Sequence, residues 1–255
     1  QHQNFGAALT LLGRTVSHVP INGAAPVQTI KRYGLCFASR GPIWQSGSTD
    51  GRAQDLRRSG LHLINSDGQD SDSLARAGFR QIKTPSYVAE VSLAGKFDDR
   101  LGRMAPKWRN IFRRTETANI SITDDPFCTT HHAWLLDEDT KQQKAKRFRS
   151  LPHVFLHAYA ISNPDCVRVF TAFKGRDPIA AMVFLLHGCV ATYHLGWSNH
   201  QGRKCAAHHA IMVNAWGYLA DRSITWLDLG AVDTVNAPGL ARFKIGTGAH
   251  IRPLG

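Results

Sequence analysis

The second half of the chain alternates apolar runs with glycine-bearing turns. VRVFTAFKG, PIAAMVFLLHG and CVATYHLGW are rich in β-branched and aromatic residues, the composition of buried strands. They predict an antiparallel meander over residues 166–174, 178–187 and 189–197. A helix over residues 205–221 follows from apolar residues at helical spacing: Ala206, Ile211, Trp216 and Leu219. A strand over residues 224–229 completes a crossover of the kind whose strand ends usually bind ligands.

The first hundred residues repeat that order of elements in a shorter form. Strands over residues 14–20 and 27–38 flank Asn22-Gly23, a common hairpin turn. The other expected elements are helices over 4–13, 50–59 and 71–77, the last capped by Ser71 or Asp72, and strands over 61–65, 79–83 and 88–93. The two halves share no matching sequence, so the repeat is one of topology.

A charged, helical region separates the two halves. It predicts helices over residues 98–104, 107–118 and 127–149, and a further helix in LPHVFLHAYA with Pro152 in its first turn. No low-complexity linker interrupts the chain. We therefore expect a degenerate N-terminal half at 1–95, a helical connection packed between the halves at 96–160, and a C-terminal half at 161–255 that carries the donor site.

Composition is that of an ordinary globular protein, with 43% hydrophobic and 20% charged residues among 255. No apolar run approaches the ~20 residues of a membrane span, and the N-terminus lacks the pattern of a signal peptide. Five cysteines without paired short spacing predict reduced thiols, hence a cytoplasmic protein. Adjacent histidines such as His208 and His209 diverge on a helix, so no metal site is expected.

The formal net charge of +12 is the most informative bulk property. Such a surface attracts anions, for example nucleotide phosphates, an acyl-carrier protein, transfer RNA or an anionic membrane surface. The alternative is that the charge reflects a generally basic proteome.

The segment LDLGAVDTVNAPGLARFKIGTG, which follows the meander, loop and long helix, resembles the end of GNAT-superfamily acyltransferase domains, in particular the bacterial Fem-type, tandem-GNAT-like branch. The residues that carry the resemblance are Asp228, Gly230, Gly239, Leu240, Phe243, Lys244 and Gly246. The helix PKWRNIFRRTE also resembles the arginine-rich segment that opens such domains. The resemblance covers residues 97–251 well and the first hundred residues loosely.

This resemblance implies an α/β (α+β) tandem GNAT-like fold with mixed central sheets flanked by helices. It implies an N-acyltransferase that moves an acyl group from acyl-CoA or a carrier-protein thioester to a small amine acceptor, with no permanently bound cofactor. Two alternatives stay open: a Fem-type transferase that uses aminoacyl-tRNA, and a non-catalytic binding protein that kept the fold. The loop NHQGRKCAAH bears on this choice, because it lacks the second glycine of the usual coenzyme A cradle.

The resemblance also assigns site residues. The donor's phosphate is expected at the loop before the long helix, formed by Gln201, Gly202, Arg203, Lys204, Cys205 and Ala206; a solvated loop is the alternative. Tyr193 and His194 point to opposite faces of their strand, and His194 is a candidate general base or an ordinary structural histidine.

Two further groups are candidates for catalysis and substrate binding. Asp228 and Lys244 are the other expected catalytic residues, although Asp228 would also serve as a local backbone cap and Lys244 as a solvent lysine. Substrate binding is expected from Asp233 and Thr234, which follow the strand, and from Trp108 and Arg109 on the basic helix, which a solvated face would also explain.

Overall fold

The computed structural model describes residues 2–45, 47, 49–68 and 70–255, and it divides into two compact units. The first unit consists of Gln1–Tyr87 with Arg252–Gly255, and the second of Val88–Ile251. The three-part division expected from the sequence stays a prediction; residues 96–160 belong to the second unit.

A four-stranded mixed sheet organises the described residues of the first unit, in the order β1-β2-β3-β4. The strands are β1 (Thr15–Val19), β2 (Val27–Arg32), β3 (Leu35–Ala38) and β4 (Leu63–Ile64). β1, β2 and β3 pair antiparallel, whereas β3 and β4 pair parallel. The helices of this unit are α1 (Gln3–Leu11), α2 (Arg52–Arg58) and α3 (Ser71–Arg76).

The first unit corrects three expectations. The single strand predicted at 27–38 is a hairpin, because Tyr33 and Gly34 adopt positive φ and turn the chain between β2 and β3. The strand predicted at 79–83 is wrong, since these described residues form no strand. The N-cap position of α3 is Asp70 instead of Ser71 or Asp72.

A seven-stranded mixed sheet runs through the described part of the second unit, in the order β11-β5-β10-β9-β8-β7-β6. Its strands are β5 (Ser86–Ser92), β6 (Ser121–Pro126), β7 (Val167–Lys174), β8 (Asp177–His187), β9 (Val190–Ser198), β10 (Trp226–Val232) and β11 (His250–Leu254). The meander from β7 to β9 is antiparallel as predicted, and β9 pairs parallel with β10.

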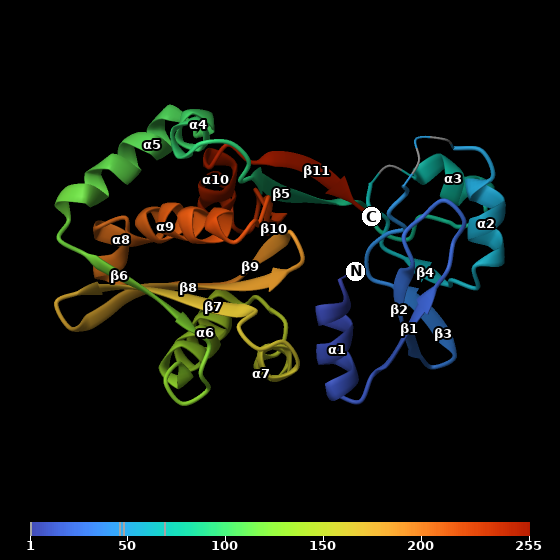
Figure 1. Ribbon diagram of the computed structural model, residues 1–255, viewed down its shortest axis with the longest axis horizontal. Helices are drawn as coiled ribbons and strands as arrows, with labels where there is room; N and C mark the ends of the chain where they lie inside the picture. The colour runs from blue at the N-terminus through green and yellow to red at the C-terminus, as the bar shows by residue number, and fades with distance from the viewer. Residues whose placement is uncertain (1, 46, 48, 69) are drawn as a thin grey trace. The chain divides into compact units, whose positions relative to one another are not determined.

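Helices cover both faces of this sheet (Figure 1). One face carries α8 (His200–Lys204), α9 (Ala207–Asp221) and α10 (Pro238–Gly246), and the other carries α6 (Ala133–Lys146) and α7 (His153–Ser162). Ahead of them come α4 (Phe97–Arg103), α5 (Pro106–Arg113) and the 3₁₀ turn η1 (Arg114–Thr117). This arrangement confirms the predicted mixed sheets flanked by helices.

Apolar residues from alternate strand positions bury the sheet on both faces. On the α9 face, Phe170 and Phe184 pack edge to face at 5.5 Å in a cluster that includes the fully buried Trp216. On the α7 face, the Tyr159 hydroxyl donates to the carbonyl of Leu186 at 2.9 Å, which ties α7 to β8. The sheet is therefore a rigid support for groups at its strand ends.

Three helix predictions in this unit need correction. The helix predicted at 127–149 begins only at Ala133, because residues 127–132 form a turn in which the N–H of Cys128 donates to Nδ1 of His132 at 3.0 Å. The helix predicted at 205–221 begins at Ala207 and is preceded by a separate short helix, α8. Ala206, with a left-handed φ of 54°, separates the two helices. Pro152 is the N-cap of α7 and does not lie in its first turn.

Candidate functional site

β9 and β10 pair only at their beginnings. The register runs from Val190 opposite Trp226 to Thr192 opposite Asp228, although both strands continue beyond these residues. Past that point each strand presents backbone and side-chain groups that the other does not use. Beyond Thr192, the predicted site strand at residues 192–197 pairs with β8 but not with β10.

A β-bulge interrupts β9 within this part. Leu195 pairs with Val183 and Tyr193 pairs with Phe184, so the register on β8 skips His194. A bulge leaves the extra residue out of the ladder and redirects its neighbours. His194 therefore has no pairing partner on β8, and it lies beyond the last β9–β10 pair, where the opening between those two strands begins.

His194 lies on the α6 side of the bulge. Burial lowers its pKa to about 4; the negative charge of Asp139 opposes this shift, and His153 adds to it. The imidazole is neutral at pH 7, and a pKa this low makes it a weak base. Helix α6 packs onto the same stretch of β9, where Gln142 donates to the carbonyl of Gly196 at 3.1 Å.

Tyr193 is directed to the opposite, α9 face, in agreement with the alternation expected of a strand. Its ring packs 5.9 Å from that of Phe184, and a side chain at Gly196 would overlap its hydroxyl. Burial raises the pKa of Tyr193, so the phenol stays protonated. Gly196 is the residue that lets Tyr193 fold back along β9.

Asp228 of β10 and Lys244 of α10 are close enough to interact electrostatically. The carboxylate of Asp228 is 5% exposed and accepts the N–H of Gly230 at 2.6 Å, which is the backbone-capping role. Lys244 of α10 is 6% exposed, and its ammonium donates to the carbonyl of Ala231 at 2.7 Å. Burial lowers the pKa of Lys244 to about 8, while the charge of Asp228 acts in the opposite direction. Lys244 is therefore a buried cation and not a solvent lysine.

Asp233 and Thr234 lie on the surface beyond this pair. Asp233 accepts the side-chain N–H of Asn236 at 2.8 Å and the backbone N–H groups of Asn236 and Val235 at 2.8 and 3.0 Å, which lowers its pKa and fixes the turn into α10. Thr234 is exposed. Their expected role in substrate binding stays a prediction.

The predicted donor loop borders a basic pocket of about 690 Å³. Its lining is Ile111, Arg114, Thr117, Ala118, Lys174, His200, Gln201, Arg203, Lys204, Cys205 and Ala206. This set, here called the basic pocket, contains four permanent cations and no carboxylate. It also borders the first turn of α9, where helix N–H groups lack intrahelical acceptors. Five of the six predicted donor residues belong to it; Gly202 does not.

The backbone of this loop is largely used by the loop itself. The N–H of Gly202 donates to the side chain of Asn199 at 2.9 Å, and those of Arg203, Cys205 and Ala206 donate to loop carbonyls. A side chain at Gly202 would clash with the carbonyl of Ile179 on β8. Gly202 is thus required for packing α8 against the sheet. These four backbone N–H groups are already engaged within the protein.

Two cations of the basic pocket come from distant parts of the sequence. Arg114 follows α5 and Lys174 ends β7. Arg114 lies in the basic segment PKWRNIFRRTE, and Lys174 is not among the residues expected from the sequence. No local pattern identifies Lys174, because its position depends on the turn of the meander.

Trp108 is buried in the core, unlike a residue on a solvated helix face. It is 4% exposed, and its indole N–H donates to the carbonyl of Phe243 at 3.0 Å. Arg109 donates to the carbonyl of Leu101 at 3.4 Å, within the α4–α5 corner. The substrate-binding role expected of both stays a prediction.

Two histidines at the start of α9, His208 and His209, also lie at the site. The sequence suggested them only as metal ligands. Nε2 of His208 bonds to the carbonyl of Trp197 on β9 at 2.8 Å. His209 packs 4.5 Å from Trp108, and burial lowers its pKa to about 4. In the described residues, no group of His, Cys, Asp and Glu gathers to hold a metal ion.

Comparisons with known proteins agree with this architecture. No family profile matches the sequence, and no curated protein matches it either. A solved structure of FemX superposes with a TM-score of 0.74 at 11% identity, covering 98% of this chain and 88% of FemX. The chain has a Fem-like GNAT fold.

Two further structures share this Fem-like GNAT fold. The C-terminal domain of a lysylphosphatidylglycerol synthetase from Agrobacterium fabrum gives a TM-score of 0.61 at 13% identity, covering 100% and 86% of the two chains. L-PGS from Bacillus licheniformis gives 0.60 at 14% identity, covering 99% and 89%. Among the described residues, no helix is both long and apolar enough to cross a membrane.

Proposed function

We propose that this protein transfers an aminoacyl group from aminoacyl-tRNA to an amine. The observation that carries the proposal is the basic pocket, where Arg114, Lys174, Arg203 and Lys204 face a shared space without a carboxylate. Four cations on side chains suit a polyanionic backbone, which offers phosphates at several positions.

The expected acyl-CoA donor fits this pocket less well. Coenzyme A pyrophosphate on a GNAT fold is cradled by backbone N–H groups, whereas here Gly202 and its neighbours already donate to the protein. A carrier-protein thioester would present a single phosphodiester, which needs fewer cations than the pocket provides. One of the similar structures adds support, since it is named for a product that contains a lysyl group.

The opening between β9 and β10 supplies the groups that aminoacyl transfer needs. The amine nitrogen attacks the ester carbonyl and loses a proton, the carbon–oxygen bond to the ribose breaks, and the ribose oxygen takes up a proton. The unpaired backbone at His194 would polarise the carbonyl, and the buried ammonium of Lys244 would stabilise negative charge on the leaving oxygen.

A transfer assay with matched variants tests the proposal. Bulk tRNA charged with radiolabelled amino acids is incubated with the protein and a set of amines, and tRNA binding is measured separately by filter retention. Arg114→Gln combined with Lys204→Gln should weaken tRNA binding by about tenfold or more. Arg113→Gln, an exposed neighbour outside the pocket, should leave binding close to that of the wild type.

The outcomes separate the three functional classes. Saturable stabilisation by acyl-CoA, lost in the same double variant, would replace tRNA with coenzyme A as the donor. Binding of tRNA without any transfer would leave a binding protein with this fold. The absence of both tRNA binding and aminoacyl transfer would overturn the proposal.

A further inference from the structure

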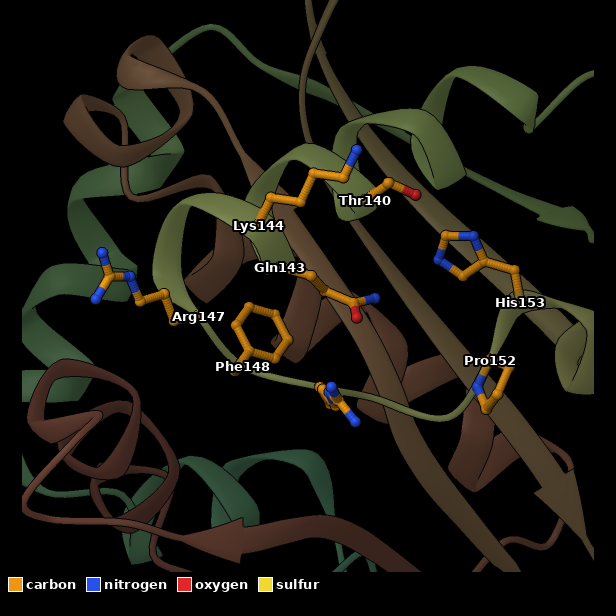
Figure 2. A pocket seen from close by; sticks show the side chains of 8 residues that line it. Thr140, Gln143, Lys144, Arg147, Phe148, Pro152 and His153 are labelled. Atoms are coloured by element: carbon orange, nitrogen blue, oxygen red, sulfur yellow. The ribbon is translucent and has the colours of Figure 1, made fainter.

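A second cavity lies on the other face of the seven-stranded sheet, at the corner between α6 and α7 (Figure 2). It has a volume of about 550 Å³. It is lined by Thr140, Gln143, Lys144, Arg147, Phe148, Arg149, Pro152 and His153. We call it the corner pocket.

A buried carboxylate organises the wall of the corner pocket. Asp139, 3% exposed, accepts hydrogen bonds from Nε2 of Gln143 at 2.6 Å, and its same oxygen lies 2.8 Å from Nε2 of His153. Because Gln143 belongs to α6 and His153 to α7, Asp139 joins the two helices. Asp139 itself does not line the pocket, and its carboxylate interacts with Gln143 and His153.

The same network fixes the connecting loop. Nε2 of Gln143 also lies 2.8 Å from the hydroxyl of Ser150, and the N–H of Phe148 donates to the backbone carbonyl of Gln143 at 3.2 Å. These bonds flank Arg147 and Arg149 in the sequence. Hydrogen bonds therefore fix the backbone that carries both arginines. A backbone that is already ordered lowers the entropy cost of binding a ligand.

The lining of the corner pocket is positively charged. Lys144, Arg147 and Arg149 are permanent cations, and the lining contains no carboxylate. Basic residues near a helix C-terminus are favoured by the helix dipole, which accounts for Lys144. It does not account for Arg147, which occupies a left-handed position (φ 53°) where glycine is the usual residue, or for Arg149 beyond the helix.

The corner pocket adjoins the bulged part of β9. Asp139 and His153 both act electrostatically on His194, and α6 is anchored on Gly196 of the same strand by Gln142. The basic pocket, by contrast, borders α8 and α9 on the opposite face. The two cationic pockets thus lie on opposite faces of the seven-stranded sheet.

We propose that the corner pocket binds a phosphate group of the acceptor, with Lys144, Arg147 and Arg149 as its cationic partners. A cluster of cations in a preformed loop matches a phosphate dianion better than a single carboxylate, because arginine forks bind phosphate oxygens in pairs. This inference rests on the proposed function in assigning the phosphate to the acceptor. The binding itself is independent of any donor.

A nuclear magnetic resonance titration tests the binding directly. Inorganic phosphate and pyrophosphate are added to the ¹⁵N-labelled full chain, and amide shifts are followed at Phe148 and Ser150, and at Cys205 in the basic pocket. Saturable shifts at Phe148 and Ser150 are expected. In Arg147→Gln combined with Arg149→Gln, the affinity reported there should fall about tenfold or more while that at Cys205 is retained.

Lys141→Gln is the matched control. Lys141 lies on α6 outside the lining and pairs with Glu138 at 2.6 Å, so its loss should leave the shifts unchanged. Absence of saturable shifts at Phe148 and Ser150, or equal affinity in the double variant, would overturn the proposal. So would shifts at these amides with tRNA but not with phosphate, because the corner would then be an RNA contact.

A sedimentation assay identifies the source of the phosphate. Vesicles that contain phosphatidylserine, whose headgroup carries both a phosphate and an amine, are compared with vesicles of phosphatidylcholine. Retention on phosphatidylserine that requires Arg147 and Arg149 would assign the phosphate to a lipid headgroup. Phosphate shifts without such retention would assign it to a soluble acceptor. Failure of tRNA-dependent transfer with the phosphate shifts intact would remove the proposed function and leave the binding site.

Discussion

The ammonium of Lys244 donates a hydrogen bond to the backbone carbonyl of Ala231 at 2.7 Å, at the end of β10. Asp228, three residues before Ala231, is the nearby carboxylate that partly offsets the burial of this cation. The pKa of Lys244 nevertheless falls from 10.5 to about 8. A cation held at this cost is more easily explained by function than by stability.

Replacing Lys244 should stabilise the folded chain at neutral pH. Because burial lowers the pKa of Lys244, keeping this lysine charged costs the folded state about 3 kcal/mol at pH 7. Lys244→Met should recover part of this free energy, because the variant also loses the hydrogen bond to Ala231. Because the unfolded chain holds the proton up to pH 10.5, wild-type stability should rise between pH 8 and pH 10.5, and the variant should lack this rise. Urea unfolding at pH 7 and pH 10 measures both effects; a variant less stable than wild type at pH 7 would contradict them.

The pH dependence of transfer should follow the same group. If the charged ammonium stabilises the leaving oxygen, single-turnover transfer should fall as pH rises through about 8, where Lys244 loses its proton. Lys244→Arg should extend activity to higher pH if the guanidinium is accommodated. A rate that rises through pH 8 would instead make neutral Lys244 the base.

Acid should destabilise the fold through His194. Its pKa is lowered from 6.5 to about 4 by burial, so the unfolded chain binds a proton that the folded chain rejects in this interval. Stability is therefore complete above pH 6.5 and is lost as pH falls toward 4, by about 2 kcal/mol at pH 5 from this residue. His194→Gln should reduce the loss by that amount in urea unfolding at pH 7 and pH 5. The exposed His200→Gln is the control, and an equal change in both variants would refute the assignment.

Gly202 and Gly217 should respond in opposite ways to alanine. A methyl group at Gly202 would collide with the carbonyl of Ile179, so Gly202→Ala should cost about 2 kcal/mol or more and displace α8. At Gly217, inside α9, no atom lies within 4 Å of the added carbon, and alanine should stabilise the helix by about 1 kcal/mol. Thermal unfolding of both variants tests this pair, and a neutral Gly202→Ala would show that the loop adapts.

The second unit was predictable from sequence where local chemistry decides structure. β-branched runs bounded by Gly175 and Gly188 predicted β7, β8 and β9 to within two residues. The left-handed turn at Ala206 was not predictable, because alanine is the strongest helix former. β6 was missed for a similar reason, since SITDDP has two aspartates and a proline and forms a strand only by pairing with β7.

The candidate site was predictable only where its residues are close in sequence. The loop at Gln201–Ala206 and the β9 residues Tyr193 and His194 could be found from the order of elements. Lys174 could not, because the turn of the meander brings it to the basic pocket. The link between Asp139 and His153 was missed likewise, since it depends on how α6 and α7 meet. Long-range packing determines such neighbours, and a single sequence carries no direct record of it.

The salt dependence of tRNA binding should report how many phosphates the basic pocket neutralises. Each cation that contacts a phosphate releases a condensed counterion, so the logarithm of affinity falls with the logarithm of salt concentration in proportion to the number of contacts. Removing Arg114 with Arg114→Gln should lower the magnitude of this slope by about 1, whereas Arg113→Gln should preserve it. Filter binding between low and moderate salt measures both slopes. If Arg114→Gln weakened binding but kept the wild-type slope, Arg114 would support the pocket through packing, and the polyanion would be held by other residues.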